Sequence, residues 1–197
     1  MATAEVAAPF PFAYAALVAA VALERVAELV LSTRNRRRAL ARGGVERGRG
    51  HYPAMVALHT GFLVACVLET WWLRRPLLPG LAASMLLLLG LSMALRYWAI
   101  AALGERWNTR VVLVPGETAV ASGPYRFVRH PNYVAVVLEM VALPLVHTAV
   151  LTALVGSALN AWLLAVRIRV EERALREHAG YDEALAGRGR FLPGASR

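Results

Sequence analysis

The sequence predicts an all-α polytopic membrane protein, with about five transmembrane helices and a cytoplasmic amphipathic helix near the C-terminus. Three observations support this fold class. Of the 197 residues, 58% are hydrophobic, and the mean hydropathy is +0.48, which is high for a soluble domain. Several apolar runs reach the roughly 20 residues needed to cross a bilayer. Arginines cluster between these runs, where they set topology. We therefore expect one integral membrane domain over residues 1–197.

The apolar runs place the expected helices. The first covers residues 8–31, the second 53–73 and the third 77–103. The run over 133–169 is much longer than one crossing requires. Pro144 is expected to divide it, because an interior proline removes a backbone hydrogen bond from a helix. The sequence thus predicts a helical hairpin as the last two of five spans.

The segment after this hairpin reads "EERALREHAGYDEALAGRGRF", with apolar residues at helical spacing and charges between them. Such a pattern is typical of an amphipathic helix. We expect it to continue the last span out of the membrane and to break near Gly180, since glycine commonly ends helices.

Arginine placement predicts the orientation. All 22 basic residues are arginine, seven of them within 34–50, four within 104–132 and seven from Arg167 onward, against two within 74–80. The positive-inside rule then places the N-terminus outside and the C-terminus in the cytoplasm. Arginines beside apolar spans are expected to meet membrane lipids. Nucleic acid is therefore not an expected partner, despite the formal charge of +9.

Several common site motifs are absent from the sequence. It contains no GxGxxG, GxxxxGK[ST], HExxH, CxxC or GxSxG, which excludes a Rossmann-type cofactor site. The single cysteine, Cys66, provides neither a disulfide nor a cysteine metal site, and we expect no metal. A nucleotide-like cofactor would have to bind among loops and helix ends.

The segment "GETAVASGPYRFVRHPNY" over 116–133 contains residue types that suit such a site. Pro131 is expected in the first turn of a helix, whose N-terminus presents free N–H groups to an anion. Arg126 and Arg129 have the reach to bind a carboxylate or a lipid phosphate, and His130 can donate to a ligand. For the two arginines, simple anchoring at the membrane surface is the alternative interpretation.

Two further groups are candidates. In "RIRVEERAL", Arg167 and Glu171 share a helix face, and an ionisable group at the end of an apolar span indicates a functional site. A plain ion pair is the alternative. In "GGVERGRGHYPAMVALH", Glu46, His51 and His59 are candidates for a general base. Packing or interfacial roles are the alternative for each histidine.

Two stretches carry a family resemblance. "LGERWNTRVVLVPGETAVASGPYRFVRHPNYVAVV" and "RIRVEERALREHAGYDEALAGRGRFLP", together covering about 95–193, resemble the isoprenylcysteine carboxyl methyltransferase family. The stretch "ERVAELVLSTRNRRRALARGGVERGRGHYPAMVALH" more specifically resembles a bacterial branch of that family. Members of this branch are associated with type III polyketide synthases and O-methylate alkylpyrones or alkylresorcinols. The resemblance implies a bacterial plasma membrane protein and a functional link to such a synthase.

The resemblance also implies roles for individual residues. An S-adenosylmethionine site would lie at the cytoplasmic face, and Arg167 would position the acceptor, with Glu46 or His51 as a possible base. The residues implied to contact the cofactor are Glu117, Thr118, Ala119, Val120, Tyr125, His130, Pro131, Asn132, Tyr133 and Glu171.

We therefore expect an S-adenosylmethionine-dependent O-methyltransferase with a lipidic small-molecule acceptor. A long-chain polyketide pyrone or resorcinol is favoured over an isoprenylcysteine carboxylate. Methyl transfer from a sulfonium mainly requires donor and acceptor to be held close and aligned. Three alternatives stay open: phospholipid N-methylation, reduction of a lipid double bond, and a non-enzymatic role as a membrane scaffold or transport component.

Overall fold

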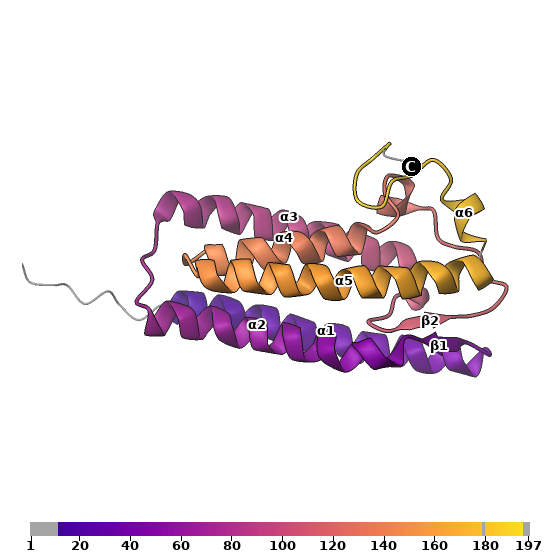
Figure 1. The fold of residues 1–197 in the computed structure, drawn as a ribbon, viewed down its shortest axis with the longest axis horizontal. Helices are drawn as coiled ribbons and strands as arrows, with labels where there is room; N and C mark the ends of the chain where they lie inside the picture. Colours follow the sequence, from indigo (N-terminus) through magenta and orange to yellow (C-terminus); the bar gives the residue numbers. More distant parts are fainter. Residues whose placement is uncertain (1–11, 179, 195–197) are drawn as a thin grey trace, which may run out of the picture.

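The protein is a bundle of long helices that run side by side along its longest axis (Figure 1). The computed structural model describes residues 12–178 and 180–194. The five long helices are α1 Phe12–Ala41, α2 Tyr52–Trp72, α3 Pro79–Leu103, α4 Pro131–Leu145 and α5 Val150–His178. Each predicted span corresponds to one of them, which confirms the all-α class. Residues 8–11 of the first predicted span lie outside the described residues.

Three helical stretches are long and apolar enough to cross a membrane: Arg49–Trp72, Pro79–Arg106 and Val150–His178. Helix α4 is apolar but has 15 residues, which is short for a full crossing. Helix α1 has 30 residues and carries Glu24, Arg25 and Glu28 in its middle part. The membrane class is therefore supported, and the number of five crossings stays a prediction.

The predicted hairpin at the end of the long apolar run is confirmed. Helix α4 ends at Leu145, one residue after Pro144, and α5 begins at Val150. Thr148 has a φ of 54° in the turn, and its hydroxyl donates to the Pro76 carbonyl at 2.6 Å. Glu69 of α2 accepts hydrogen bonds from the first-turn amides of α5, at 3.1 Å from Leu151 and 2.6 Å from Thr152. These contacts fix the end of the bundle that lies away from the polar segments.

The short elements gather at the opposite end of the bundle (Figure 1). Strands β1 Val45–Arg47 and β2 Val111–Leu113 form a small antiparallel sheet, in which Glu46 faces Val112. The others are the 3-10 turns η1 Arg49–His51, η2 Gly104–Arg106 and η3 Gly123–Arg126, and helix α6 Tyr181–Ala184. The polar segments thus share one end of the molecule, and the sequence does not predict the sheet between two of them.

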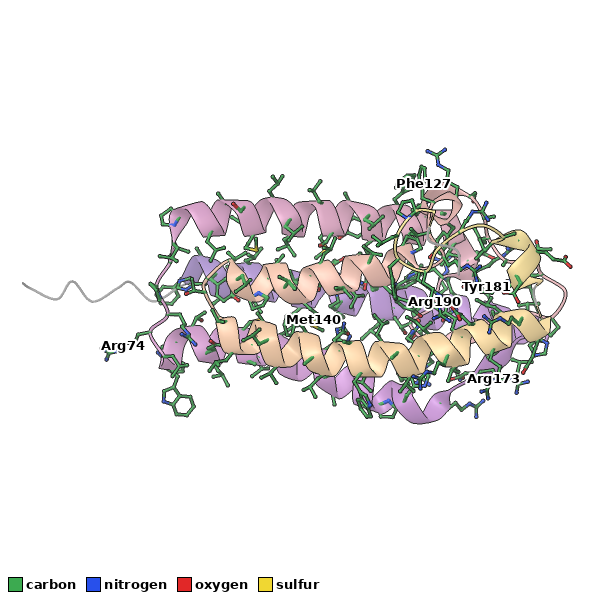
Figure 2. All side chains as sticks on the ribbon, turned by 45° about the horizontal axis from the view of Figure 1, so that its top comes forward. Arg74, Phe127, Met140, Arg173, Tyr181 and Arg190 are labelled. Atoms are coloured by element: carbon green, nitrogen blue, oxygen red, sulfur yellow. The ribbon has the colours of Figure 1, made fainter. Side chains whose placement is uncertain are left out.

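The C-terminal tail folds back onto this end. Gly180 has a φ of +55° between α5 and α6, which confirms the predicted break. The carbonyls of Gly189 and Arg190 accept hydrogen bonds from the amides of Arg129 and His130 at 2.9 and 3.0 Å. Figure 2 shows Arg190 and Tyr181 together at this end. The tail is therefore part of the polar end rather than a separate appendage.

The main apolar core lies in the other half of the bundle. Its largest cluster joins Tyr14 of α1, Phe62 and Cys66 of α2, Leu89 of α3 and Leu143 of α4. Cys66 is fully buried, which agrees with a packing role. This core holds the helices together and leaves the polar end free to form cavities.

Candidate active site

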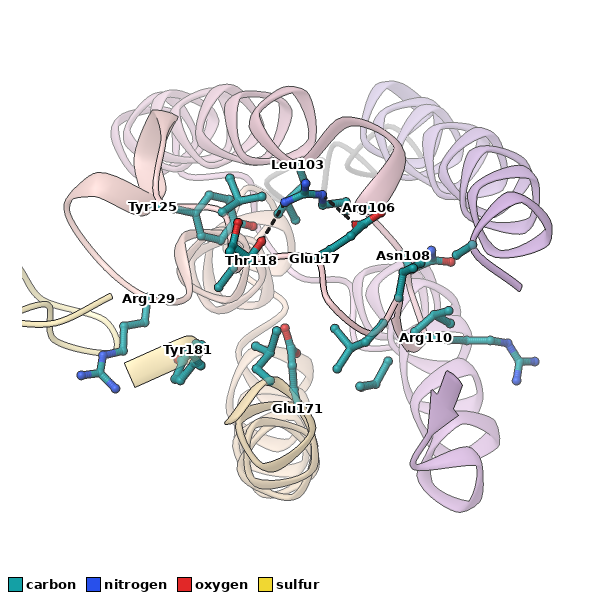
Figure 3. Close-up of a pocket in the computed structure, with 18 of the residues that line it drawn as sticks. Leu103, Arg106, Asn108, Arg110, Glu117, Thr118, Tyr125, Arg129, Glu171 and Tyr181 are labelled. Carbon is teal, nitrogen blue, oxygen red and sulfur yellow. Dashed lines mark hydrogen bonds and ion pairs between the residues drawn. The ribbon is translucent and has the colours of Figure 1, made fainter. Parts of the chain in front are cut away.

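A polar cavity lies at the end of the bundle where the short elements gather (Figure 3). Its lining comes from the end of α1, the loop after α3, the turn η3, the last part of α5, and α6. Seven residues with an expected cofactor role line it: Glu117, Thr118, Ala119, Val120, Tyr125, His130 and Glu171. The structure therefore brings together residues 117–120, the stretch with Tyr125 and His130, and Glu171 of α5.

Ion pairs hold the loop at the edge of this cavity. The Glu117 carboxylate lies 3.0 Å from Arg42 and 3.0 Å from Arg106. Arg106 also donates to the Thr118 carbonyl at 2.8 Å, and Figure 3 shows both Arg106 contacts as dashed lines. The two arginines fasten the loop to the ends of α1 and α3. They also place positive charge beside the cavity, where a bound carboxylate would be stabilised.

Two tyrosines complete the polar cavity. Both Tyr125 and Tyr181 are buried. Burial, reinforced by the negative charge of Glu171, raises the pKa of the Tyr125 phenol. Burial and the charge of Glu172 likewise raise the pKa of Tyr181. Both phenols are therefore neutral at ordinary pH and offer a ring face and a hydroxyl, not a basic phenolate.

His130 contacts other side chains of the protein through Nε2. This atom lies 3.1 Å from Glu172 Oε1 and 3.3 Å from the Tyr181 hydroxyl. Glu172 in turn accepts hydrogen bonds from Arg190 at 2.7 and 2.6 Å. The imidazole thus joins the start of α4 to α5 and the tail, and contact of His130 with a cofactor stays a prediction. Its partner is Glu172 rather than Glu171, because adjacent helical residues point about 100° apart.

A second cavity lies deeper in the bundle, among the long helices. Its walls are mostly apolar and include Leu29 of α1, Val56 of α2 and Leu164 of α5. Asn132 and Tyr133 line this cavity and not the polar one, whereas Pro131 lines neither. The expected cofactor segment is therefore divided between two cavities, because the first turn of α4 directs successive side chains to different sides.

The two cavities share a wall. Asn108 and Arg167 line both of them. Arg167 Nε donates to the Tyr133 hydroxyl at 2.7 Å, and its Nη1 donates to the Thr109 carbonyl at 2.5 Å. The Tyr133 hydroxyl donates to Glu171, which lines the polar cavity. A continuous hydrogen-bonded path therefore connects the two cavities.

Two polar atoms near the shared wall are available to a ligand. Asn108 Nδ2 and Asn132 Oδ1 are buried without a hydrogen-bond partner among the residues described. The amide oxygen of Asn108 is already paired, because Oδ1 accepts a hydrogen bond from Ser32 of α1 at 3.1 Å. Buried polar groups are rarely left unpaired in native proteins. The free amide groups therefore point to a polar ligand at the junction.

The three candidates for a base lie in different places. Glu46 lines neither cavity, and its carboxylate pairs with Arg36 at 2.7 Å and Arg110 at 2.8 Å. Burial favours the neutral acid, but these two arginines outweigh it and hold the pKa of Glu46 below its ordinary value. His51 also lines neither cavity, whereas His59 lines the deeper one. These ion pairs fix the small sheet, and a base at Glu46 or His51 stays a prediction.

Sequence reasoning missed several residues of the site. Asn108 belongs to the shared wall and contacts Ser32, Thr109 accepts from Arg167, and Glu172 and Arg190 form the support beneath His130. The only available signal was the polar group "WNTR" directly after an apolar run. The contacts of Ser32 and Arg190 depend on residues more than ten positions away, which no local pattern reveals.

This fold and this site define a class: a helical membrane protein with a polar cavity at one end and an apolar cavity behind it. Residues 84–177 match the model of the isoprenylcysteine carboxyl methyltransferase family. The protein named "Uncharacterized protein YpbQ" from Bacillus subtilis is 36% identical over 172 residues, which cover 83% of this chain and 96% of the relative. An uncharacterized Haemophilus influenzae protein is 29% identical over 154 residues, covering 77% and 88%. The chain belongs to the isoprenylcysteine carboxyl methyltransferase family and is therefore a membrane methyltransferase.

Proposed function

We propose that the protein transfers a methyl group from S-adenosylmethionine to an oxygen of a lipid-like acceptor. One observation carries this proposal: the polar and apolar cavities meet at Asn108 and Arg167. A soluble donor and a lipidic acceptor need separate binding sites that touch at one point. The reaction then mainly needs proximity and alignment.

The polar cavity suits the donor by its chemistry. S-adenosylmethionine carries a carboxylate, an ammonium and a sulfonium group. Arg42 and Arg106 line the cavity and suit the carboxylate, while Glu171 suits a cation. The ring of Tyr125 offers a π face to the sulfonium or to adenine. When bound, the cofactor supplies an electrophilic methyl group.

The deeper cavity suits a lipidic acceptor that arrives from the bilayer. Leu29 of α1 and Val56 of α2 both line it, and they are 40% and 41% exposed. The cavity therefore opens sideways between these two helices. An apolar chain can lie in this opening while its polar group reaches the shared wall.

The residues of the shared wall position the acceptor oxygen. Arg167 is held by the Tyr133 hydroxyl and the Thr109 carbonyl, so its charge is fixed in a largely dry place. There a positive charge strongly stabilises an anionic oxygen. A carboxylate or an acidic enol needs no base. For a phenol, His59 is the candidate that lines the same cavity.

The favoured acceptor is a long-chain polyketide pyrone or resorcinol, ahead of an isoprenylcysteine carboxylate. We place the reaction at the cytoplasmic face of a bacterial plasma membrane, with the N-terminus outside. The arginine distribution supports that orientation, and the matched relatives from Bacillus and Haemophilus support a bacterial setting. A type III polyketide synthase would then supply the acceptor.

The first test is equilibrium binding of tritiated S-adenosylmethionine to the detergent-solubilised full chain. We expect saturable binding, weakened at least about 10-fold by Glu171→Gln because a charged contact with the cofactor is lost. Glu177→Gln, an exposed change on the same helix, serves as the matched control. Lack of saturable binding by a protein that retains a normal melting transition would refute the proposal.

The second test supplies acceptors. Label transfer to a long-chain pyrone or resorcinol supports the proposal, as does transfer to an isoprenylcysteine analogue. Transfer only to phosphatidylethanolamine would favour N-methylation instead. Identification of the methylated atom by mass spectrometry separates these outcomes.

A further inference from the structure

The apolar cavity ends in charged residues that the proposed reaction does not use. Arg25 and Glu28 of α1 and Arg96 of α3 line it, together with the groups of the shared wall. We infer that Glu28, supported by Arg25 and Arg96, binds a second oxygen of the acceptor and so selects a ring that carries two oxygens. This inference rests on the proposed function, because it concerns the same acceptor cavity.

The charged residues form one buried cluster. Arg25 donates to Glu28 Oε2 at 2.8 Å, and Arg96 donates to Glu139 of α4 at 2.5 Å. Arg96 also lies 3.6 Å from Glu28, and Arg25 pairs with Glu24. Glu28 is 8% exposed and Arg96 is 5% exposed. Ionisable groups at such a depth in a membrane protein are costly and usually functional.

The cluster is not internally satisfied. Glu28 Oε1, Arg25 Nε and Arg96 Nε are buried and have no hydrogen-bond partner within the part of the chain that the structure describes. An unpaired buried polar group costs about 1–3 kcal/mol, so a cluster that served packing alone would be expected to pair these atoms. All three residues line the cavity, where a bound hydroxyl can both donate and accept.

The charge balance indicates what kind of group binds. The cluster contains three carboxylates, on Glu24, Glu28 and Glu139, and two guanidinium groups. Its formal charge is therefore one unit negative when all five groups are ionised. A negative cluster repels a carboxylate or phosphate and favours a hydrogen-bond donor. A hydroxyl that donates to Glu28 Oε1 fits best.

The spacing indicates where this hydroxyl lies on the acceptor. Ser32 contacts Asn108 and Thr109 at the shared wall, and Glu28 lies four residues earlier on the same face of α1. Four residues correspond to roughly 6 Å along a helix. Two oxygens on different carbons of one ring can therefore reach the shared wall and Glu28 at the same time.

The proposed arrangement assigns each part of the acceptor. One ring oxygen lies at Asn108 and Arg167, where it gives its proton to His59 and takes the methyl group, leaving S-adenosylhomocysteine. The second oxygen donates to Glu28. The alkyl chain leaves past Leu29, which adjoins Glu28 in α1 and is partly exposed. A site built to hydrogen-bond a hydroxyl discriminates strongly against an analogue that lacks it.

The test compares two probes with the same chain, pentadecylresorcinol and meta-pentadecylphenol. Initial rates of tritiated methyl transfer give kcat/KM for each probe with the full chain in detergent. We expect wild type to prefer the resorcinol at least about 10-fold, which exceeds the statistical advantage of two equivalent hydroxyls. In Glu28→Gln, the ratio of the two kcat/KM values should fall toward the statistical value, which is set by the number of hydroxyls alone.

Glu24→Gln is the matched control. It removes the same charge from the same cluster, but Glu24 does not line the cavity. It should retain the wild-type ratio. Glu28→Asp keeps the charge and shortens the reach, so it should lower the ratio even if Glu28→Gln fails to show a melting transition.

Each other outcome contradicts the inference in a distinct way. A wild-type ratio at the statistical value overturns it, as does an unchanged ratio in Glu28→Asp. An equal collapse in Glu24→Gln would assign the effect to net charge and not to Glu28. Saturable cofactor binding without transfer to either probe overturns the inference and leaves the proposed function to other acceptors. No cofactor binding at all defeats the proposed function itself.

Discussion

The two cavities are built in different ways. The polar cavity is lined largely by short loops and turns, whose backbone is fixed by ion pairs such as Glu117 with Arg42 and Arg106. The apolar cavity is lined by side chains from five helices that are distant in the sequence. One stretch of the chain, residues 103–120, thus supplies most of the lining of the first cavity, whereas packing of the helices forms the second. Substitutions should accordingly separate cofactor binding from acceptor use.

The largest expected effect concerns the support beneath the polar cavity. Glu172→Gln removes a buried charge that binds His130 and Arg190. Loss of one partner from a buried ion pair should lower the free energy of unfolding by about 3 kcal/mol. Thermal melting in detergent measures this change, with exposed Glu183→Gln as the control. A melting temperature equal to that of wild type would show that the tail is not fastened through Glu172.

Arg167→Ala tests the wall shared by both cavities. Loss of its charge and of its bonds to Tyr133 and Thr109 should reduce kcat/KM for the acceptor about 100-fold, or about 2.7 kcal/mol. Steady-state methyl transfer measures this, and cofactor affinity should change much less. Exposed Arg169→Ala is the control on the same helix. An equal loss of cofactor affinity would assign Arg167 to the polar cavity instead.

Val56→Trp tests the apolar cavity alone. The larger ring should obstruct the opening between α1 and α2 and reduce acceptor kcat/KM about 10-fold, or about 1.4 kcal/mol. Binding of S-adenosylmethionine should stay at the wild-type level. Val64→Trp places the same ring on an exposed part of α2 that does not line the cavity, and should have little effect. Similar losses from both changes would contradict a lateral opening at Val56.

The smallest expected effect concerns pH and Glu46. Because its pKa is lowered in the folded state, the ionised carboxylate stabilises the fold above its ordinary pKa, and this contribution is lost as pH falls through the lowered value. Glu46→Gln should cost about 1 kcal/mol at neutral pH. Its difference from wild type should shrink in acid. Melting temperatures measured from about pH 7 to about pH 3 test this, and a constant difference would contradict it.

Hydropathy predicts most of the fold. Each apolar run forms a helix, and Pro144 and Gly180 mark breaks where the sequence places them. The small sheet escapes prediction because strands of three residues depend on pairing across the chain, here between Glu46 and Val112. Local propensity carries little information about such a short pair.

The sequence predicts only part of the site, because other parts also depend on contacts between distant segments of the chain. The loop after Gly116 and the residue Glu171, which the resemblance groups together, line the same polar cavity, and their contact with a cofactor stays a prediction. Asn132 and Tyr133 lie on the other cavity, because a sequence motif does not show how a helix is rotated against its neighbours. Glu28 and Arg96 were not connected by any local pattern, since they come from different helices and meet only after packing.

The hydrogen bonds between residues 129–130 and residues 189–190 impose an order on biosynthesis. The chain is made from the N-terminus, so the helices can enter the membrane while the tail is still inside the ribosome. The amide of His130 cannot meet the carbonyl of Arg190 until the segment that carries Arg190 has left the ribosome. The bundle can therefore begin to form earlier, but the polar cavity becomes complete only after this segment folds back. A truncation before Gly189 should leave a membrane-inserted protein whose polar cavity is open and unfinished.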